Sequence, residues 1–170
     1  MITARRLTRD DFALMPGLVA LLQDAVDHGA SVGYLAPLDN GPAWDYWLGV
    51  MDKLESGLLC WVALEGQTIV GTVQLDPCTK QNGRHRGEVC KLLTLSSCRR
   101  RGVAALLMQQ VEAEARLRGM KLLFLDTEAQ SPAEKFYQSQ GWTRSAEIPW
   151  YALTAQGQLC ATVFYYKMLT

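Results

Sequence analysis

The chain has no excess charge of either sign, no long apolar run and little that suggests secretion. Its 170 residues carry 17 Lys and Arg against 17 Asp and Glu, so the formal net charge is zero. A dedicated nucleic-acid-binding protein usually carries a basic excess, and that class is therefore disfavoured. No stretch approaches the ~20 apolar residues of a membrane-spanning helix, and the first ten residues lack the apolar core of a signal peptide. The sequence therefore predicts a cytoplasmic protein that binds neither nucleic acid nor a membrane.

Metal-ligating and disulfide-forming patterns are also missing. The five cysteines include no Cys-x-x-Cys pair, and the two histidines, His28 and His85, lie far apart in the sequence. This spacing predicts no metal site. Cys60, Cys90 and Cys160 lie in apolar runs that favour strands, which predicts buried free thiols rather than a disulfide framework.

Length and composition predict one mixed α/β domain that spans residues 1–170. Hydrophobic residues make up 49% of the chain and charged residues 20%, as in ordinary globular proteins. The apolar run at residues 121–126 favours a strand that is buried on both faces. Residues 29–42 are rich in Gly and Pro and predict a loop. Periodicity and turn residues predict strands at residues 3–7, 58–64, 68–75, 88–95, 121–126, 142–147 and 159–168, and helices that follow Thr8 and cover residues 43–56, 101–118 and 131–140.

A basic turn joins the fourth predicted strand to the third helix. It reads Arg99-Arg100-Arg101-Gly102-Val103-Ala104. A helix start carries unpaired backbone N–H groups and a partial positive charge, both of which favour phosphate binding. Gly102 lets the backbone approach a bulky anion closely. Charge and glycine alone do not distinguish such a site from a solvent-exposed basic turn.

A family resemblance makes the turn more specific. Arg99-x-x-Gly102-x-Ala104 resembles the pyrophosphate-binding motif, Gln/Arg-x-x-Gly-x-Gly/Ala, of the GNAT superfamily of N-acetyltransferases. The segment 131–142 looks like the helix of that family that flanks the pantetheine of acetyl-CoA. The sequence departs from the pattern at Ser96, where many relatives have Pro, and at Arg100 and Ala104, where many have Gly. The resemblance implies a central, mostly antiparallel sheet with a splayed parallel strand pair, flanked by helices.

Four further segments look like the tabtoxin resistance protein branch of that superfamily, which acetylates a β-lactam amino-acid toxin. These segments are residues 29–34, 88–92, 125–129 and 164–167. The resemblance covers nearly the whole chain. It implies an acyltransferase that moves an acetyl group from acetyl-CoA to a primary amine by direct attack, with a role in toxin resistance.

The resemblance also implies roles for individual residues. Glu88 is the first candidate for the general base, Asp126 the second, and Tyr137 the candidate acid. Read without the family, Glu88 is equally a solvated strand-end carboxylate, Asp126 a turn cap and Tyr137 a core residue. The residues expected to contact acetyl-CoA are Leu93, Thr94, Leu95, Arg99, Arg100, Arg101, Gly102, Val103, Ala104, Ala105, Ser131, Glu134, Phe136 and Tyr137.

Three functional hypotheses remain open at this level. The first is an N-acetyltransferase for a small amine that resembles an amino acid, a toxin or an antibiotic. The second is a protein or peptide N-acetyltransferase, and the third is a catalytically silent acetyl-CoA-binding module. Superfamily members often pair, so the resemblance also allows a homodimer.

Overall fold

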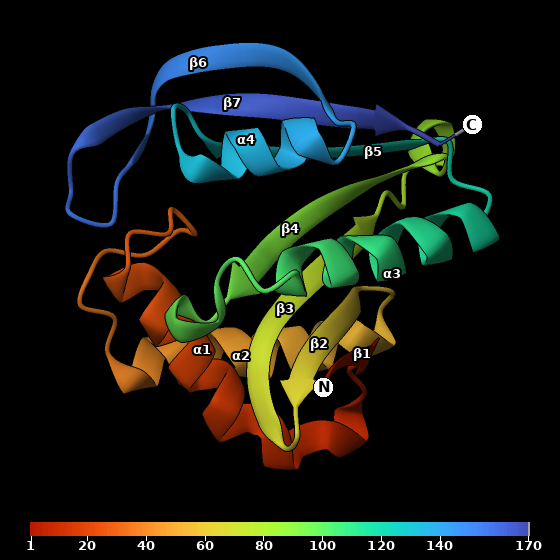
Figure 1. Cartoon of the computed structure of the whole chain (residues 1–170). Helices are drawn as coiled ribbons and strands as arrows, with labels where there is room; N and C mark the ends of the chain where they lie inside the picture. Colours follow the sequence, from red (N-terminus) through yellow and green to blue (C-terminus); the bar gives the residue numbers. More distant parts are fainter. Residues whose placement is uncertain (170) are drawn as a thin grey trace.

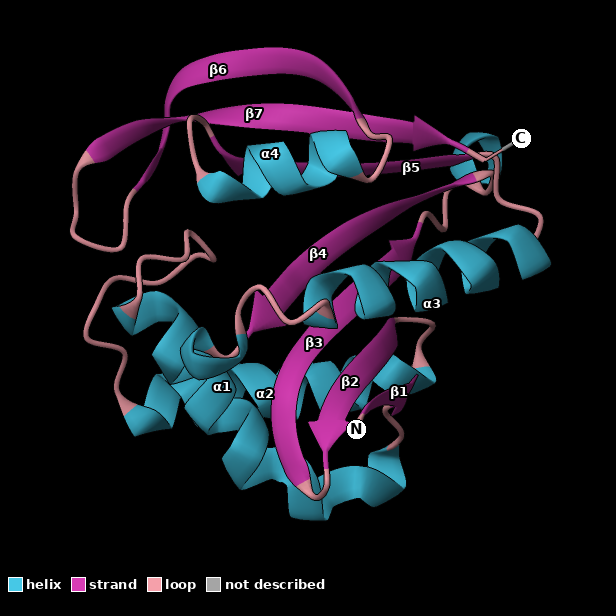
Figure 2. Ribbon diagram, in the orientation of Figure 1, coloured by secondary structure: helices cyan, strands magenta, loops and turns pink. Residues whose placement is uncertain are grey.

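Residues 1–169, which the computed structural model describes, form a seven-stranded sheet with helices on both faces (Figures 1 and 2). The strand order is β1-β2-β3-β4-β5-β7-β6, and every neighbouring pair is antiparallel except β4 and β5. The predicted mixed α/β fold is thereby confirmed. In chain order the elements are β1 (Ile2–Arg6), η1 (Arg9–Leu14), α1 (Met15–Asp27), α2 (Asn40–Glu55), β2 (Leu59–Glu65), β3 (Thr68–Pro77), η2 (Gln81–Gly83), β4 (Arg86–Thr94), η3 (Ser96–Cys98), α3 (Val103–Leu117), β5 (Leu122–Glu128), α4 (Pro132–Ser139), β6 (Thr143–Leu153) and β7 (Leu159–Met168).

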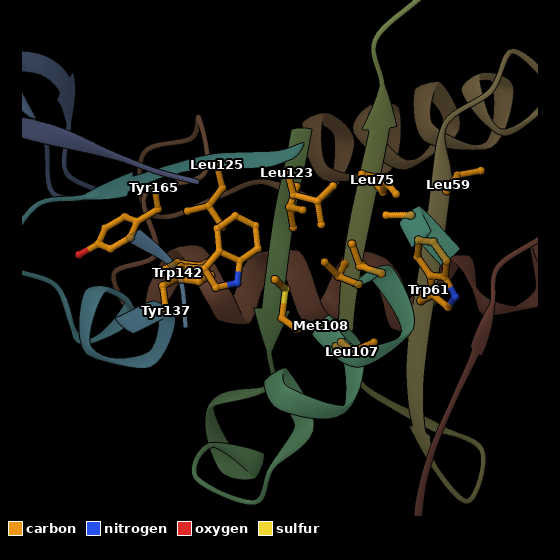
Figure 3. Close-up of a cluster of buried hydrophobic side chains, with 14 of the residues drawn as sticks. Leu59, Trp61, Leu75, Leu107, Met108, Leu123, Leu125, Tyr137, Trp142 and Tyr165 are labelled. Carbon is orange, nitrogen blue, oxygen red and sulfur yellow. The ribbon is translucent and has the colours of Figure 1, made fainter. Parts of the chain in front are cut away.

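Two apolar clusters hold the helices against the sheet. One lies under α3 and α4 and contains side chains such as Leu107, Leu123 and Trp142, which Figure 3 draws with other members of the cluster. The other lies under α1 and α2 and contains the fully buried Trp47. Burial of this kind stabilises the fold by about 25 cal/mol for each Å² of apolar surface removed from water. Each face of the sheet is therefore covered by its own helix pair.

Helix α3 approaches β3 closely because Gly71 has no side chain. A Cβ at this position would lie 2.6 Å from a methyl group of Val103, at the start of α3. Real Cβ atoms do not approach a neighbour so closely, and a larger residue would push the helix start away. Gly71 thus fixes the height of the basic turn above the sheet.

The predicted helices need two corrections. The first is split into η1 and α1, because Asp11 leaves the helical conformation and Pro16 lies in the first turn of α1. Asp11 still accepts a hydrogen bond from the Thr8 backbone N–H, at 2.8 Å, as predicted for a capping pair. Helix α2 begins three residues earlier than predicted, because Pro42 is tolerated in a first helical turn.

The predicted strands also need corrections. The expectation that residues 121–126 are buried on both faces is wrong. Leu123 and Leu125 are fully buried, but Leu122 and Phe124, on the opposite face of the strand, are only half-buried, because neither apolar cluster reaches them. Strand β6 extends six residues beyond the predicted Glu147, to Leu153, and its pairing with β7 contains two register shifts.

The thiols are free, but they are less uniformly buried than the sequence predicts. All five cysteines are unpaired, and Cys60 is fully buried as expected. Cys90 and Cys160 are half-buried, so the prediction of burial holds for only one of the three strand cysteines. Within residues 1–169, none of the helices has the length and apolar character needed to cross a membrane.

Candidate active site

Strands β4 and β5 run parallel for only a short distance and then splay apart. The three residue pairs are Arg86 with Leu122, Gly87 with Leu123, and Glu88 with Phe124. Beyond Glu88 the edge of β4 that faces β5 has no strand partner among residues 1–169, and Figure 2 shows the two strands diverging. Backbone N–H and C=O groups on such an edge are free to bind a ligand. Glu88 therefore stands at the point where the sheet opens.

The two candidate bases meet at this opening. Asp126 lies two residues beyond Phe124 on β5, and so on the same face of its strand. The pKa of Glu88 is raised, first by loss of solvation and then by the negative charges of Asp126 and of Asp76, its cross-strand neighbour on β3. The pKa of Asp126 is raised by loss of solvation and lowered in part by Lys91. The register of β4 with β5 therefore places the two carboxylates on the same face of the opening, and the effect of Asp126 on the pKa of Glu88 agrees with this.

Neither carboxylate makes an ion pair with a side chain of residues 1–169. Glu88 is half-buried and Asp126 is exposed, and a partly buried carboxylate with a purely structural role is usually paired or hydrogen-bonded. Unpaired carboxylates with raised pKa values are typical of groups that exchange protons. Glu88 and Asp126 are both available for that role.

Tyr137 lies on α4, under the same opening. It is 7% exposed, and its ring packs against Trp142 and Tyr165, each with ring centres 6.0 Å away (Figure 3). Its pKa is raised, first by burial and next by the charge of Asp126. The hydroxyl therefore stays protonated at neutral pH and can donate a proton or a hydrogen bond. The influence of Asp126 on its pKa also indicates that Tyr137 lies near that carboxylate.

The remaining predicted residues of α4 divide into two groups. Ser131 is the N-cap residue, and its buried hydroxyl has no hydrogen-bond partner within residues 1–169. Phe136 is half-buried and packs against the core under α3 and α4. Glu134 has protein partners instead: its carboxylate accepts hydrogen bonds from the Tyr165 hydroxyl at 2.7 Å, the Gln130 backbone N–H at 2.6 Å and Arg144 at 3.1 Å. These bonds give Glu134 a structural role in holding α4 to β7.

The basic turn presents its backbone and two of its arginines to solvent. Arg100 and Gly102 both have positive φ angles, of 61° and 81°, and no heavy atom lies within 4 Å of the position where a Cβ would stand on Gly102. Arg99 and Arg100 are exposed, and neither forms an ion pair within the described chain. The N–H groups of Val103, Ala104 and Ala105 open helix α3 and have no intrahelical acceptor. The open turn and its charge fit the pyrophosphate of acetyl-CoA.

Arg101 differs from the two arginines before it. Its guanidinium donates to both oxygens of Glu65, at 3.0 and 2.6 Å, and also to the sulfur of Cys98 at 3.5 Å. The pair lies in a surface hollow between the chain start and the first turn of α3. Arg101 therefore anchors the turn to the end of β2, and Arg99 and Arg100 are the arginines left to meet a phosphate.

The residues at the end of β4 that were expected to contact acetyl-CoA differ in their accessibility. Leu93 is buried, while Thr94 and Leu95 are half-buried. The Leu95 N–H donates to Val70 O at 2.9 Å, so it is not available to a ligand. A β-bulge opposite residues 72–74 shifts the register of β4 at Lys91, which adopts a positive φ of 52°. Bulges of this kind often re-aim groups at functional sites.

Sequence reasoning missed one residue that holds the basic turn in place. Asp24 of α1 accepts hydrogen bonds from the Ser96 backbone N–H and from the Ser96 hydroxyl, both at 2.7 Å. Ser96 opens the turn, and a proline there would lack the N–H that Asp24 binds. The departure at Ser96 was the available signal, but its partner lies 72 residues away and has no sequence pattern.

We expect the Asp24→Ala variant to bind acetyl-CoA less tightly. Loss of two hydrogen bonds to a carboxylate should lower the free energy of unfolding by about 2 kcal/mol and loosen the turn, which raises KM for acetyl-CoA. Steady-state kinetics and thermal melting measure the two effects. Asp27→Ala, an exposed position on the same helix, is the matched control. An Asp24→Ala enzyme with parental KM would show that Asp24 does not position the turn.

The fold and the site together define a class of enzyme. An open, basic helix start beside a splayed strand pair suits group transfer from a phosphate-bearing donor, and the two carboxylates and the phenol supply proton transfer. The sequence profile of the acetyltransferase (GNAT) family matches residues 34–142. The chain belongs to this family. Acetyl-CoA is the family's acetyl donor, and the protein is accordingly an acetyl-CoA-dependent N-acetyltransferase.

Solved structures share this fold over nearly their whole length. Ribosomal-protein-alanine N-acetyltransferase from Brucella melitensis is 24% identical, with a TM-score of 0.81 over 98% of this chain and 99% of that chain. YncA from Salmonella typhimurium, solved with acetyl-CoA, is 19% identical, with a TM-score of 0.79 over 99% and 94%. A phosphinothricin acetyltransferase from Sinorhizobium meliloti, in complex with acetyl-CoA, is 14% identical, with a TM-score of 0.82 over 99% and 88%. These likenesses show the fold.

Proposed function

We propose that the enzyme acetylates the primary amine of a small, amino-acid-like molecule, such as a toxin or an antibiotic. The observation that carries the proposal is the pair of unpaired carboxylates, Glu88 and Asp126, at the opening between β4 and β5. Two structural neighbours are named as phosphinothricin acetyltransferases, which supports a small acceptor. A place in the tabtoxin resistance branch belongs to the same proposal and rests on the sequence segments that resemble that branch.

The proposed chemistry is a direct transfer in which each proton has a destination. An alkyl amine with a pKa near ~10 is mostly protonated at neutral pH, and Glu88 or Asp126 accepts its proton. The free amine then forms a C–N bond to the thioester carbonyl carbon while the C–S bond breaks. The thiolate that leaves takes a proton from Tyr137, which its raised pKa keeps protonated until that step. The second proton that the nitrogen loses, after the C–N bond has formed, returns to the tyrosinate through solvent. Arg99, Arg100 and the N–H groups that open α3 hold the phosphates of the donor.

The decisive experiment measures thiol release from acetyl-CoA against a broad panel of amines. The panel contains phosphinothricin, β-lactam and other antibiotic amines, free amino acids and short peptides with free N-termini. Rapid release with small amines and little with peptides is the expected result. Release confined to peptides would favour the second hypothesis, a peptide N-acetyltransferase. Acetyl-CoA binding without release from any amine would identify a silent binding module.

We also propose that the enzyme pairs as a homodimer through the β6 face. Strand β6 is an edge strand, and its large apolar side chains are exposed, with Trp150 at 77%. Such a concentration on one edge is typical of an interface. Sedimentation should therefore show a dimer, and Trp150→Glu should yield a monomer. Leu117→Glu, on the exposed face of α3, is the control, and a monomeric parent would refute the pairing.

The free thiols support a location in the cytoplasm as part of the same proposal. All five cysteines are unpaired, and reducing compartments keep thiols in this state.

A further inference from the structure

A lysine ammonium group lies at the opening without a carboxylate partner. Lys91 follows Cys90 on β4 and is half-buried. It forms no ion pair with any side chain of residues 1–169. Its ammonium group is therefore available to an anionic group of a ligand.

The position of the ammonium group is held by three parts of the fold. The β-bulge gives Lys91 its positive φ of 52°, and its Nζ lies 5.5 Å from the centre of the Tyr46 ring on α2. Tyr46 is fixed in turn by the buried Gln74 of β3, whose Nε2 donates to the Tyr46 hydroxyl at 2.9 Å. The ring of Tyr34, from the loop before α2, packs edge-on against Tyr46 with centres 6.1 Å apart. The ammonium group is therefore positioned in advance of binding.

Lys91 also lies close to both candidate bases. Its positive charge acts on Glu88 and on Asp126 and opposes the rise of their pKa values. The charged groups that interact with it are Glu88 from its own strand and Asp126 from β5, and Asp76 of β3 is the cross-strand neighbour of Glu88. One side of the opening thus combines one unpaired cation with two unpaired carboxylates.

This arrangement complements a zwitterion better than a simple amine. In an α-amino acid the ammonium and carboxylate groups are attached to the same carbon. The ammonium group can face Glu88 and Asp126 while the carboxylate faces Lys91. A plain amine leaves Lys91 unpaired, and the N-terminus of a peptide has an amide where the carboxylate would be. The charge pattern therefore discriminates between acceptors of equal amine basicity.

We propose that Lys91 binds the carboxylate of the acceptor, so that the enzyme selects free amino-acid-like zwitterions over plain amines and over peptide N-termini. The inference rests on the proposed function, because it concerns the acceptor of the same reaction. It assigns to Lys91 a role in specificity and none in proton transfer.

The test compares free L-amino acids with their own carboxamides in the thiol-release assay. The two members of each pair share a side chain, and because loss of the carboxylate also lowers the pKa of the amine, kcat/KM is compared per unprotonated amine. Because an ion pair with hydrogen bonds is involved, kcat/KM for the free acid should exceed that for the amide by about ten- to a hundredfold. In Lys91→Met this ratio should fall to about one, and Lys91→Arg should restore much of it. Lys53→Met, an exposed lysine on α2, should keep the parental ratio.

A role limited to tuning the carboxylates predicts a different pattern. Lys91→Met would then shift the pH–rate profile and slow acids and amides by the same factor, which would overturn the proposal. Equal kcat/KM for acids and amides in the parent would also overturn it, while leaving the proposed function intact. No thiol release from any acceptor would overturn both. Melting curves establish that each variant folds.

Discussion

The Tyr137→Phe variant is expected to turn over at least about 100-fold more slowly than the parent enzyme. The substitution removes one hydroxyl and keeps the ring, so the packing against Trp142 and Tyr165 remains. Because we propose that the phosphates bind at the basic turn and not at Tyr137, KM for acetyl-CoA should stay near the parental value. Steady-state kinetics with varied acetyl-CoA separate the two constants.

The control is Tyr166→Phe, at an exposed position on β7. It should match the parent in both constants. A Tyr137→Phe enzyme with parental kcat would remove Tyr137 from the mechanism and leave it a core residue. A fall in affinity without a fall in kcat would instead assign it to donor binding.

The second large effect is expected when both carboxylates are neutralised. Glu88→Gln combined with Asp126→Asn should lower kcat/KM for the acceptor by about 10²- to 10⁴-fold at neutral pH. Each single variant should lose less if the partner can accept the proton in its place. A non-additive double-variant cycle would show that the two groups act together.

The pH dependence has a definite sign. A carboxylate acts as a base only when it is deprotonated, so kcat/KM falls as the pH drops through its pKa. Since both pKa values are raised, the fall should occur above the ordinary range of about 3.9 to 4.3. In the double variant this limb should vanish, and the rate should climb toward the pKa of the amine itself. An unchanged profile would show that solvent takes the proton.

The stability of the double variant provides a check on folding. A group whose pKa is raised in the folded state binds its proton more tightly there, so it stabilises the fold at low pH and loses this contribution as the pH rises through its folded pKa. At neutral pH the two partly desolvated, mutually repelling charges therefore oppose folding. The neutral amides should melt at or above the parental temperature. A lower melting temperature would attribute any loss of activity to structure.

Sequence patterns predicted most helices and strands because neighbouring residues determine where these elements begin and end. Ser131-Pro132 opens α4 as expected, and residues 159–168 form a strand with the predicted bounds. The basic turn also follows its motif, since the positive φ of Gly102 needs no distant partner. The candidate bases were predicted individually. Their proximity depends on the parallel register of Glu88 with Phe124, which joins residues 36 positions apart.

The contacts between distant elements escaped prediction for the same reason. The bond from Ser96 to Asp24 and the bidentate pair between Arg101 and Glu65 depend on how α1 and β2 pack against the turn. Three consecutive arginines look equivalent in the sequence, yet Arg101 is bound to Glu65 while Arg99 and Arg100 are not. The position of Lys91 depends on a bulge, and no residue in 88–94 marks one. Tertiary packing decides these roles.

The splay between β4 and β5 leaves unpaired backbone groups in the middle of the sheet and not only on its edge strands. Beyond Glu88, backbone groups of β4 that a neighbouring strand would otherwise satisfy stay open toward β5. A donor that pairs with these groups would complete the sheet and make the same hydrogen bonds as a strand. Its binding would then stabilise the fold itself, and the melting temperature should rise with the concentration of acetyl-CoA.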